Sequence, residues 1–116
     1  MKYLLMCCTE EKELAGLSKS ECDALITSAY CEALHTNGHL IVAEALEPVE
    51  MATTVRVRNG TLSTTDGPFA ETKEQFGGFF LINARDLNEA IQVASKFPSV
   101  RLGSMEVRPV MELHQQ

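Results

Sequence analysis

The side chains best suited to chemistry in this chain gather in one short segment, Asp66–Gln75, which reads DGPFAETKEQ. An Asp-Gly-Pro turn opens the segment, and proline makes such a turn rigid by fixing its own φ and restricting the residue before it. Carboxylates in such a setting can exchange protons, and an ammonium group can stabilise developing negative charge. The polar groups that follow from this reasoning are Asp66, Glu71, Thr72, Lys73 and Glu74.

Asp66 is the best candidate for a general acid or base. Burial beside Phe69 and a neighbouring carboxylate at Glu71 would both raise its pKa toward the working range of such a group. We therefore predict Asp66 as catalytic and Glu71, Thr72, Lys73 and Glu74 as ligand-binding. The alternative is that the turn is ordinary turn chemistry and the charged run is a solvated surface.

Arg108 lies outside this segment but is predicted to reach the same ligand. A guanidinium can hold a carboxylate or another anion in bidentate fashion, which makes Arg108 a sixth candidate. The alternative is an exposed or interfacial ion pair with Glu106, which stands two residues earlier on the same face of the last strand.

Gly77 and Gly78 follow the segment inside an apolar strand. Glycine in a strand interior costs roughly 0.5–1 kcal/mol relative to alanine. A double glycine there predicts close approach to the backbone by a bulge, another chain or a ligand.

The elements that must position these residues can be read from the pattern. Apolar runs predict strands over about 2–8, 40–46, 75–83 and 105–111, and residues 10–17 are predicted to be a loop. A capping box of Ser18 and Glu21 starts a helix over about 19–36, which ends at Asn37-Gly38. A second helix is capped by Asp86, with Glu89 at the capping-box position, and is stopped by Pro98. Between the second and third strands, Asn59-Gly60 predicts a β-hairpin that sets Val57 opposite Leu62 and Thr54 opposite Thr65.

The resulting order of elements is β–α–β, a hairpin, then β–α–β in a single domain over residues 1–116. Two amphipathic helices are buried most economically on one face of the sheet. The prediction is an α+β fold, a ferredoxin-like α/β sandwich with an added β-hairpin. The sheet face without helices predicts a homodimer. Arg56 and Arg58 are predicted to be solvated on the hairpin.

Composition excludes several classes of function. A net charge of −6 and scattered basic residues argue against nucleic acid. The apolar run at the N-terminus is too short to span a membrane and lacks a signal-peptide pattern. Cys7, Cys8, Cys22 and Cys31 form no C-x-x-C pair, so we expect reduced, mostly buried thiols and a cytoplasmic location. We expect no metal and no cofactor, since no ligand set or cofactor motif is present.

The stretch from Thr65 to Phe79, TDGPFAETKEQFGGF, resembles the DGPF branch of the YCII-related domain family. The resemblance continues through residues 52–58 and 106–111 and covers essentially the whole chain. It implies a dimeric ferredoxin-like fold, a dimeric α+β barrel, with a suspected active or ligand-binding cleft beside the signature. In the YCII branch a histidine on the first helix and an aspartate near the end of the second are the suspected pair. This chain departs there, since its first histidine is His35 and Lys96-Phe97-Pro98 holds no acid.

The resemblance leaves two functional hypotheses. One relative is a dehydrochlorinase acting on a chlorinated hydroxyquinone, which implies lyase- or dehalogenase-like acid–base chemistry on a small organic molecule. Members of the DGPF branch also often occur beside extracytoplasmic-function sigma factors. The alternative is therefore a non-catalytic module that senses a small molecule or binds a partner in transcription regulation.

Overall fold

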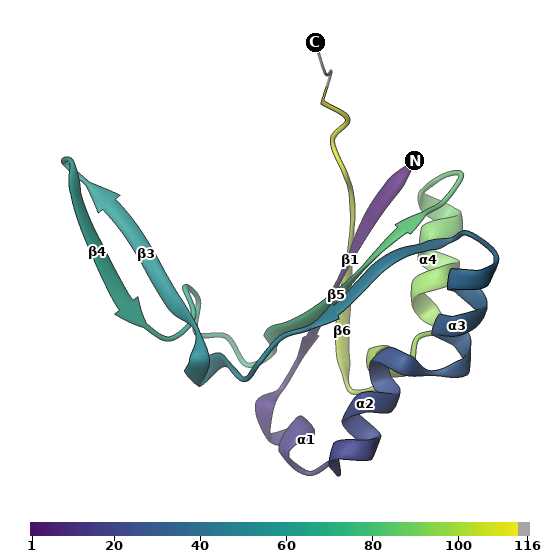
Figure 1. Cartoon of the computed structure of the whole chain (residues 1–116), viewed down its shortest axis with the longest axis horizontal. Coiled ribbons are helices and arrows are strands. Elements are labelled where there is room, and N and C mark those ends of the chain that lie inside the picture. The colour runs from purple at the N-terminus through teal and green to yellow at the C-terminus, as the bar shows by residue number, and fades with distance from the viewer. Residues whose placement is uncertain (114–116) are drawn as a thin grey trace.

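The longest apolar runs of the chain form the middle of a four-stranded antiparallel sheet with the order β2-β5-β1-β6. The computed structural model describes residues 1–113, apart from the side chains of Cys22, Leu25, Ile26 and Thr27. The strands are β1 Lys2–Thr9, β2 Leu40–Ala45, β5 Gln75–Asn83 and β6 Gly103–Pro109. Their order is that of a ferredoxin-like sandwich, which confirms the predicted fold class (Figure 1).

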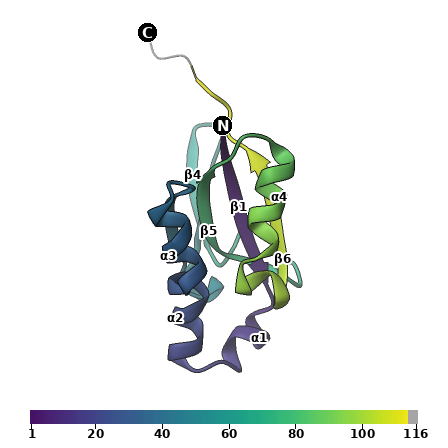
Figure 2. The same cartoon turned by 90° about the vertical axis from the view of Figure 1, so that its right-hand side faces the viewer.

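The helices cover one face of this sheet, as predicted (Figure 2). They are α1 Glu11–Ala15, α2 Lys19–Thr27, α3 Ala29–Thr36 and α4 Leu87–Ser95. The prediction of a loop over 10–17 is wrong in its middle, where good helix formers build the single turn of α1. No helix in residues 1–113 has both the length and the apolar character needed to cross a membrane.

The single helix predicted over 19–36 is two helices, divided at Ser28. Ser28 is extended, with φ −62° and ψ 160°, and its hydroxyl accepts a hydrogen bond from the Cys31 amide at 3.3 Å. It therefore ends α2 and caps α3, because a serine side chain can replace the helical backbone bond. The capping box of Ser18 and Glu21 at the start of α2 is confirmed.

The second predicted helix begins as expected, with the Asp86 carboxylate accepting from the Glu89 amide at 2.9 Å. The Glu89 carboxylate does not close a capping box, because it accepts from the Arg85 amide instead. Pro98 lies three residues past α4 and opens a 3₁₀ turn, Pro98–Arg101.

The core lies between the helices and the covered face of the sheet. Its fully buried side chains are Tyr3, Leu5, Ile82, Phe80 and Phe97. Phe97 stacks on Phe80 with ring centroids 4.0 Å apart, and Tyr30 packs edge-on against Phe97 at 5.0 Å. Aromatic rings thus join the sheet to both helical segments.

The opposite face of the sheet is left without helices and carries half-buried apolar side chains. Strand alternation turns Leu4 and Met6 of β1 and Phe79 and Leu81 of β5 to this open face. Glu106 and Arg108 of β6 lie beside them and form an ion pair. The alternative interpretation of Arg108, an exposed ion pair with Glu106, is what the structure shows, with both side chains exposed.

The predicted hairpin projects away from the sandwich as a separate two-stranded arm, β3 Thr53–Arg58 and β4 Thr61–Asp66 (Figure 1). Val57 pairs with Leu62 and Thr54 with Thr65, so the predicted register is confirmed. Asn59 and Gly60 both have positive φ, 52° and 76°, which suits a tight hairpin turn.

One face of the arm is apolar. Alternation places Val55, Val57 and Leu62 together on it, and their exposed fractions are 60%, 59% and 64%. Asp66 pairs with Thr53 at the base of the same face. The arm therefore presents an apolar surface that the described part of its own chain does not cover.

Candidate functional site

Asp66 ends β4 at the base of the arm, and its side chain is exposed. The turn behind it is held firmly: the Gly67 amide donates to the Ala52 carbonyl at 2.8 Å, and the Thr54 hydroxyl donates to the Gly67 carbonyl at 2.9 Å. Gly67 has φ 103°, a conformation that favours glycine. The backbone that carries Asp66 is thus fixed, although its carboxylate is not buried beside Phe69 within this chain.

Phe69 packs instead with the arm. Its ring is 78% exposed, and the guanidinium carbon of Arg56 lies 5.5 Å from the ring centroid, a cation–π distance. The prediction that Arg56 is solvated is therefore wrong in part, since Arg56 is half-buried. Arg58 is exposed as predicted.

The charged run after the turn contains no helical turn. The Thr72 hydroxyl donates to the Glu74 carbonyl at 2.6 Å, and the side-chain amide Nε2 of Gln75 donates to the Thr72 carbonyl at 2.8 Å. These side-chain hydrogen bonds occupy backbone carbonyl groups that would accept backbone amides in a helix. Glu71 stays exposed beside them.

Lys73 ties this run to the end of β1. Its ammonium lies 3.3 Å from the Glu10 carboxylate, and Lys12 lies at the same distance on the other oxygen. Desolvation works against ionisation of Glu10, but hydrogen bonds from Lys73 and Lys12 outweigh it and hold the pKa of Glu10 below its ordinary value.

Replacing Lys73 by methionine is expected to raise the titration midpoint of Glu10, measured by NMR of its carboxyl carbon. A pKa lowered by folding stabilises the native state above the unfolded-state pKa, and this contribution is lost as the pH falls through the lowered value. The free energy of unfolding of the variant should therefore fall less than that of the parent protein as the pH is lowered through the range in which Glu10 titrates. Lys96→Met, on an exposed residue after α4, is the control. An unchanged Glu10 midpoint would show that Lys73 does not hold this carboxylate in solution.

The signature segment borders a pocket of about 640 Å³ on the open-face side of the sheet, here called the signature pocket. Met6 and Cys8 of β1 and Phe76 of β5 form its floor. The wall formed by the signature segment is Pro68, Phe69, Ala70, Thr72, Glu74 and Gln75.

Of the predicted site residues, Thr72 and Glu74 line this pocket. Asp66 lies at the base of the arm, and Lys73 turns to Glu10. Arg108 lies on β6, beyond β1, where it pairs with Glu106. Within one chain the six predicted residues therefore do not converge on one point.

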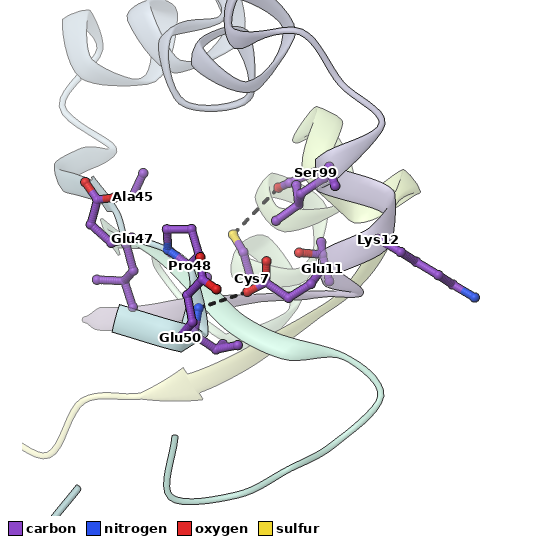
Figure 3. Close-up of a pocket in the computed structure, with 15 residues that line it drawn as sticks. Cys7, Glu11, Lys12, Ala45, Glu47, Pro48, Glu50 and Ser99 are labelled. Atoms are coloured by element: carbon purple, nitrogen blue, oxygen red, sulfur yellow. Dashed lines mark hydrogen bonds between the residues drawn. The ribbon is translucent and has the colours of Figure 1, made fainter. Parts of the chain in front are cut away.

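A second pocket of about 760 Å³ lies on the helix side of the sheet and is here called the helix-side pocket (Figure 3). Cys7, Thr9 and Ser99 line it, and the Cys7 sulfur lies 3.6 Å from the Ser99 hydroxyl. Sequence reasoning missed this site, because Ser99 meets Cys7 across 92 residues of chain. The adjacent Gly77 and Gly78 were its only signal.

Two structural features explain why glycine occupies positions 77 and 78. The register of β1 and β5 shifts between Cys7 and Cys8, and Gly77 is the unpaired residue of this bulge. A Cβ on Gly78 would lie 3.0 Å from the Glu44 carbonyl oxygen of β2. Both glycines also line the helix-side pocket, so the predicted bulge is confirmed beside an open space.

The two pockets share one wall, the segment from Leu46 to Val49. Glu11 of α1 holds this wall in place by accepting a hydrogen bond from the Val49 amide at 3.1 Å. Cys7 and Cys8 point to opposite faces of β1, one into each pocket. Burial is the main cause that raises the pKa of each thiol.

Among the described residues, Cys7 and Cys31 are buried free thiols and Cys8 is a half-buried one, while the Cys22 side chain lies outside that part of the structure. No three metal-binding side chains in the described part of the chain converge.

Comparison with known proteins gives three findings. A family model described as the YCII-related domain matches residues 1–114. An uncharacterised protein of Rhizobium meliloti (strain 1021) is 36% identical, with 95% of this chain and 92% of that protein covered. The fold is similar to a solved structure of 5-chloro-2-hydroxyhydroquinone dehydrochlorinase from Burkholderia phenoliruptrix AC1100, in complex with 2,5-dihydroxybenzoquinone. The TM-score is 0.54 at 16% identity, with 96% of this chain and 94% of that chain covered.

Proposed function

The chain belongs to the YCII-related domain family, and from this premise we propose that it is a homodimer that binds a small organic molecule in the signature pocket. The observation that carries the proposal is that the most distinctive segment of the sequence forms one wall of an apolar pocket. Thr72, Glu74 and Gln75 of this segment and Glu47 of the Leu46–Val49 wall are the polar residues that line it. An apolar pocket with few polar groups is the usual form of a small-molecule site.

The proposed chemistry is lyase- or dehalogenase-like, with Asp66 as the general acid or base. Asp66 shares a face of the arm with Val55, Val57 and Leu62. A second copy that covers this face would take the Asp66 carboxylate out of water, and desolvation raises a carboxyl pKa toward the range that proton transfer needs. The base would remove a proton while the leaving group departs with its bonding pair.

A homodimer also accounts for the open face of the sheet. The half-buried side chains of β1 and β5 there and the apolar face of the arm are the two uncovered apolar surfaces described above. In a twofold-symmetric dimer the same surfaces of both copies cover each other. The free thiols support a reducing compartment, which for this protein we propose to be the cytoplasm.

The second candidate function is a non-catalytic module that senses a small molecule or binds a regulatory partner. The exposure of Asp66 and Glu71 within one chain favours it, because neither carboxylate is desolvated there. In this reading the signature pocket binds without turnover.

Asp66→Asn tests the proposal in a thermal-shift screen of a few hundred small metabolites. We expect the melting temperature without ligand to stay within about 1 °C of the parent protein, since the carboxylate is exposed. Compounds that raise the melting temperature of the parent protein should no longer raise that of the variant, or should no longer be converted by it.

Glu32→Gln, on an exposed side chain of α3, is the matched control and should retain every compound. Compounds bound equally by Asp66→Asn and the parent, without turnover by either, would favour the sensing module. A melting temperature that collapses in Asp66→Asn would make Asp66 a structural turn residue.

A further inference from the structure

We propose that the helix-side pocket is a second binding site, for an uncharged planar aromatic molecule that carries a hydroxyl or carbonyl group. The site is separate from the signature pocket and lies on the other side of the Leu46–Val49 wall. The polar groups, the shape and the charges of the pocket all favour such an occupant.

The polar groups lie at the base of the pocket and are almost fully buried. Thr9 is 5% exposed and Ser99 is 6% exposed. In the described part of the chain, the Ser99 hydroxyl meets only the Cys7 sulfur, a weak hydrogen-bond partner. Among the groups that the structure describes, the Thr9 hydroxyl has no hydrogen-bond partner.

No completely enclosed side-chain oxygen in those residues lacks a partner, so the Thr9 hydroxyl opens onto the pocket. A hydroxyl that opens onto the pocket is free to bond to water or to a ligand oxygen, and the Ser99 hydroxyl has only a weak sulfur partner to give up.

The floor of the pocket is flat. Gly78 pairs with Cys7 on one side and Ala45 on the other, so small side chains follow one another across three neighbouring strands. A Cβ added to Gly77 would lie 4.0 Å from the Gln75 carbonyl oxygen and from the Thr9 hydroxyl, at ordinary van der Waals contact, so this glycine adds no bulk to the floor. A planar ring can lie on such a surface, whereas a thick aliphatic group fits it less closely.

The charges exclude an anionic ligand. Glu47 and Glu50 are exposed at the mouth, and Glu11 lies on the wall. Lys12 extends away from the pocket and pairs with Glu10 (Figure 3). Burial raises the pKa of the Cys7 thiol, so the base of the pocket stays uncharged at neutral pH. A carboxylate entering it would pass these glutamates, and the ammonium of Lys12, whose side chain contributes to the lining, is already paired with Glu10.

Three probes of similar size test the assignment by isothermal titration with the full chain: phenol, cyclohexanol and benzoate. We expect phenol to bind, and cyclohexanol and benzoate to bind at least fivefold more weakly. Thr9→Val removes the hydroxyl at nearly constant volume and should weaken phenol binding roughly three- to tenfold. Ala45→Leu, which places a larger side chain over the flat floor, should abolish it.

Thr64→Val on the exposed arm is the control and should leave phenol affinity unchanged. The parent protein should also alkylate at Cys7 more slowly when phenol is present. Equal binding of benzoate, or phenol affinity unchanged in both Thr9→Val and Ala45→Leu, would overturn the proposal. Phenol affinity lost in Phe69→Ala but kept in Thr9→Val would place the probe in the signature pocket and also overturn it. Failure of the Asp66→Asn screen leaves this test unaffected, because Asp66 does not line the helix-side pocket.

Discussion

Replacing Phe97 by alanine is expected to lower the free energy of unfolding by about 3–5 kcal/mol, the usual cost of removing a buried phenylalanine. Phe97 is 1% exposed and contacts both Phe80 of the sheet and Tyr30 of α3. The variant would lose both ring contacts and leave a cavity at the centre of the core. The free energy of unfolding of a native domain is only about 5–15 kcal/mol, so this substitution would remove a large fraction of it.

Urea unfolding followed by circular dichroism measures this change. Phe69→Ala is the matched control within the same chain, because that ring is 78% exposed and has Arg56 as its cation–π partner. It should cost no more than about 1 kcal/mol. Equal losses in the two variants would show that the Phe80–Phe97 stack is not the centre of the core.

The triple variant Val55→Thr, Val57→Thr and Leu62→Thr is expected to dissociate the proposed homodimer. Threonine keeps the β-branched shape that suits a strand but replaces apolar surface with a hydroxyl. If the second copy buries these three side chains, we expect the dimer dissociation constant to rise at least tenfold. A two-stranded ribbon is marginal in water by itself, so the arm also depends on what covers it.

Charge favours a second copy as the cover. The arm carries two arginines and one aspartate, which gives it a net charge of +1. Because the whole chain has a net charge of −6, the residues outside the arm have a net charge of −7. An arm of one copy laid on the body of the other therefore brings opposite charges together.

Light scattering over a concentration series gives the dissociation constant, and far-ultraviolet circular dichroism checks that the variant is folded. Arg58→Gln, on the opposite face of the arm, is the control and should affect dimerisation much less. A parent protein that is monomeric at all concentrations, or a triple variant that dimerises as tightly as the parent, would contradict the prediction.

Local chemistry explains why much of the fold could be predicted from the sequence. Asn59-Gly60 and the β-rich flanks predict a hairpin because both turn residues need positive φ, and the register then follows from the turn length. Ser18 and Asp86 start helices by bonding amides three residues ahead. Such signals depend on residues close together in the sequence, so they can be recognised without the tertiary structure.

The break at Ser28 could not be predicted because serine is compatible with either a helix interior or a cap. The helical pattern is continuous on both sides of it. Here the chain turns so that Cys31 and Leu34 of α3 reach the core, and the gain from burying them decides the outcome.

The candidate site was located in part. The turn, the charges and the double glycine identified a segment that does border a pocket, with Thr72 and Glu74 on its wall. Asp66, Lys73 and Arg108 were assigned to that site by residue type, but their positions depend on tertiary contacts. The pairing of Lys73 with Glu10 is one such contact, since it joins two residues that are separated by more than half the length of the chain.

The Leu46–Val49 wall separates the two pockets and borders both of them. A ligand that shifts this segment toward one pocket enlarges the other, and the hydrogen bond from Val49 to Glu11 is the contact that such a shift would strain. If ligands occupy both pockets and either one shifts this wall, the two binding equilibria are thermodynamically linked. Whatever factor the first ligand applies to the affinity for the second, the second must apply to the first.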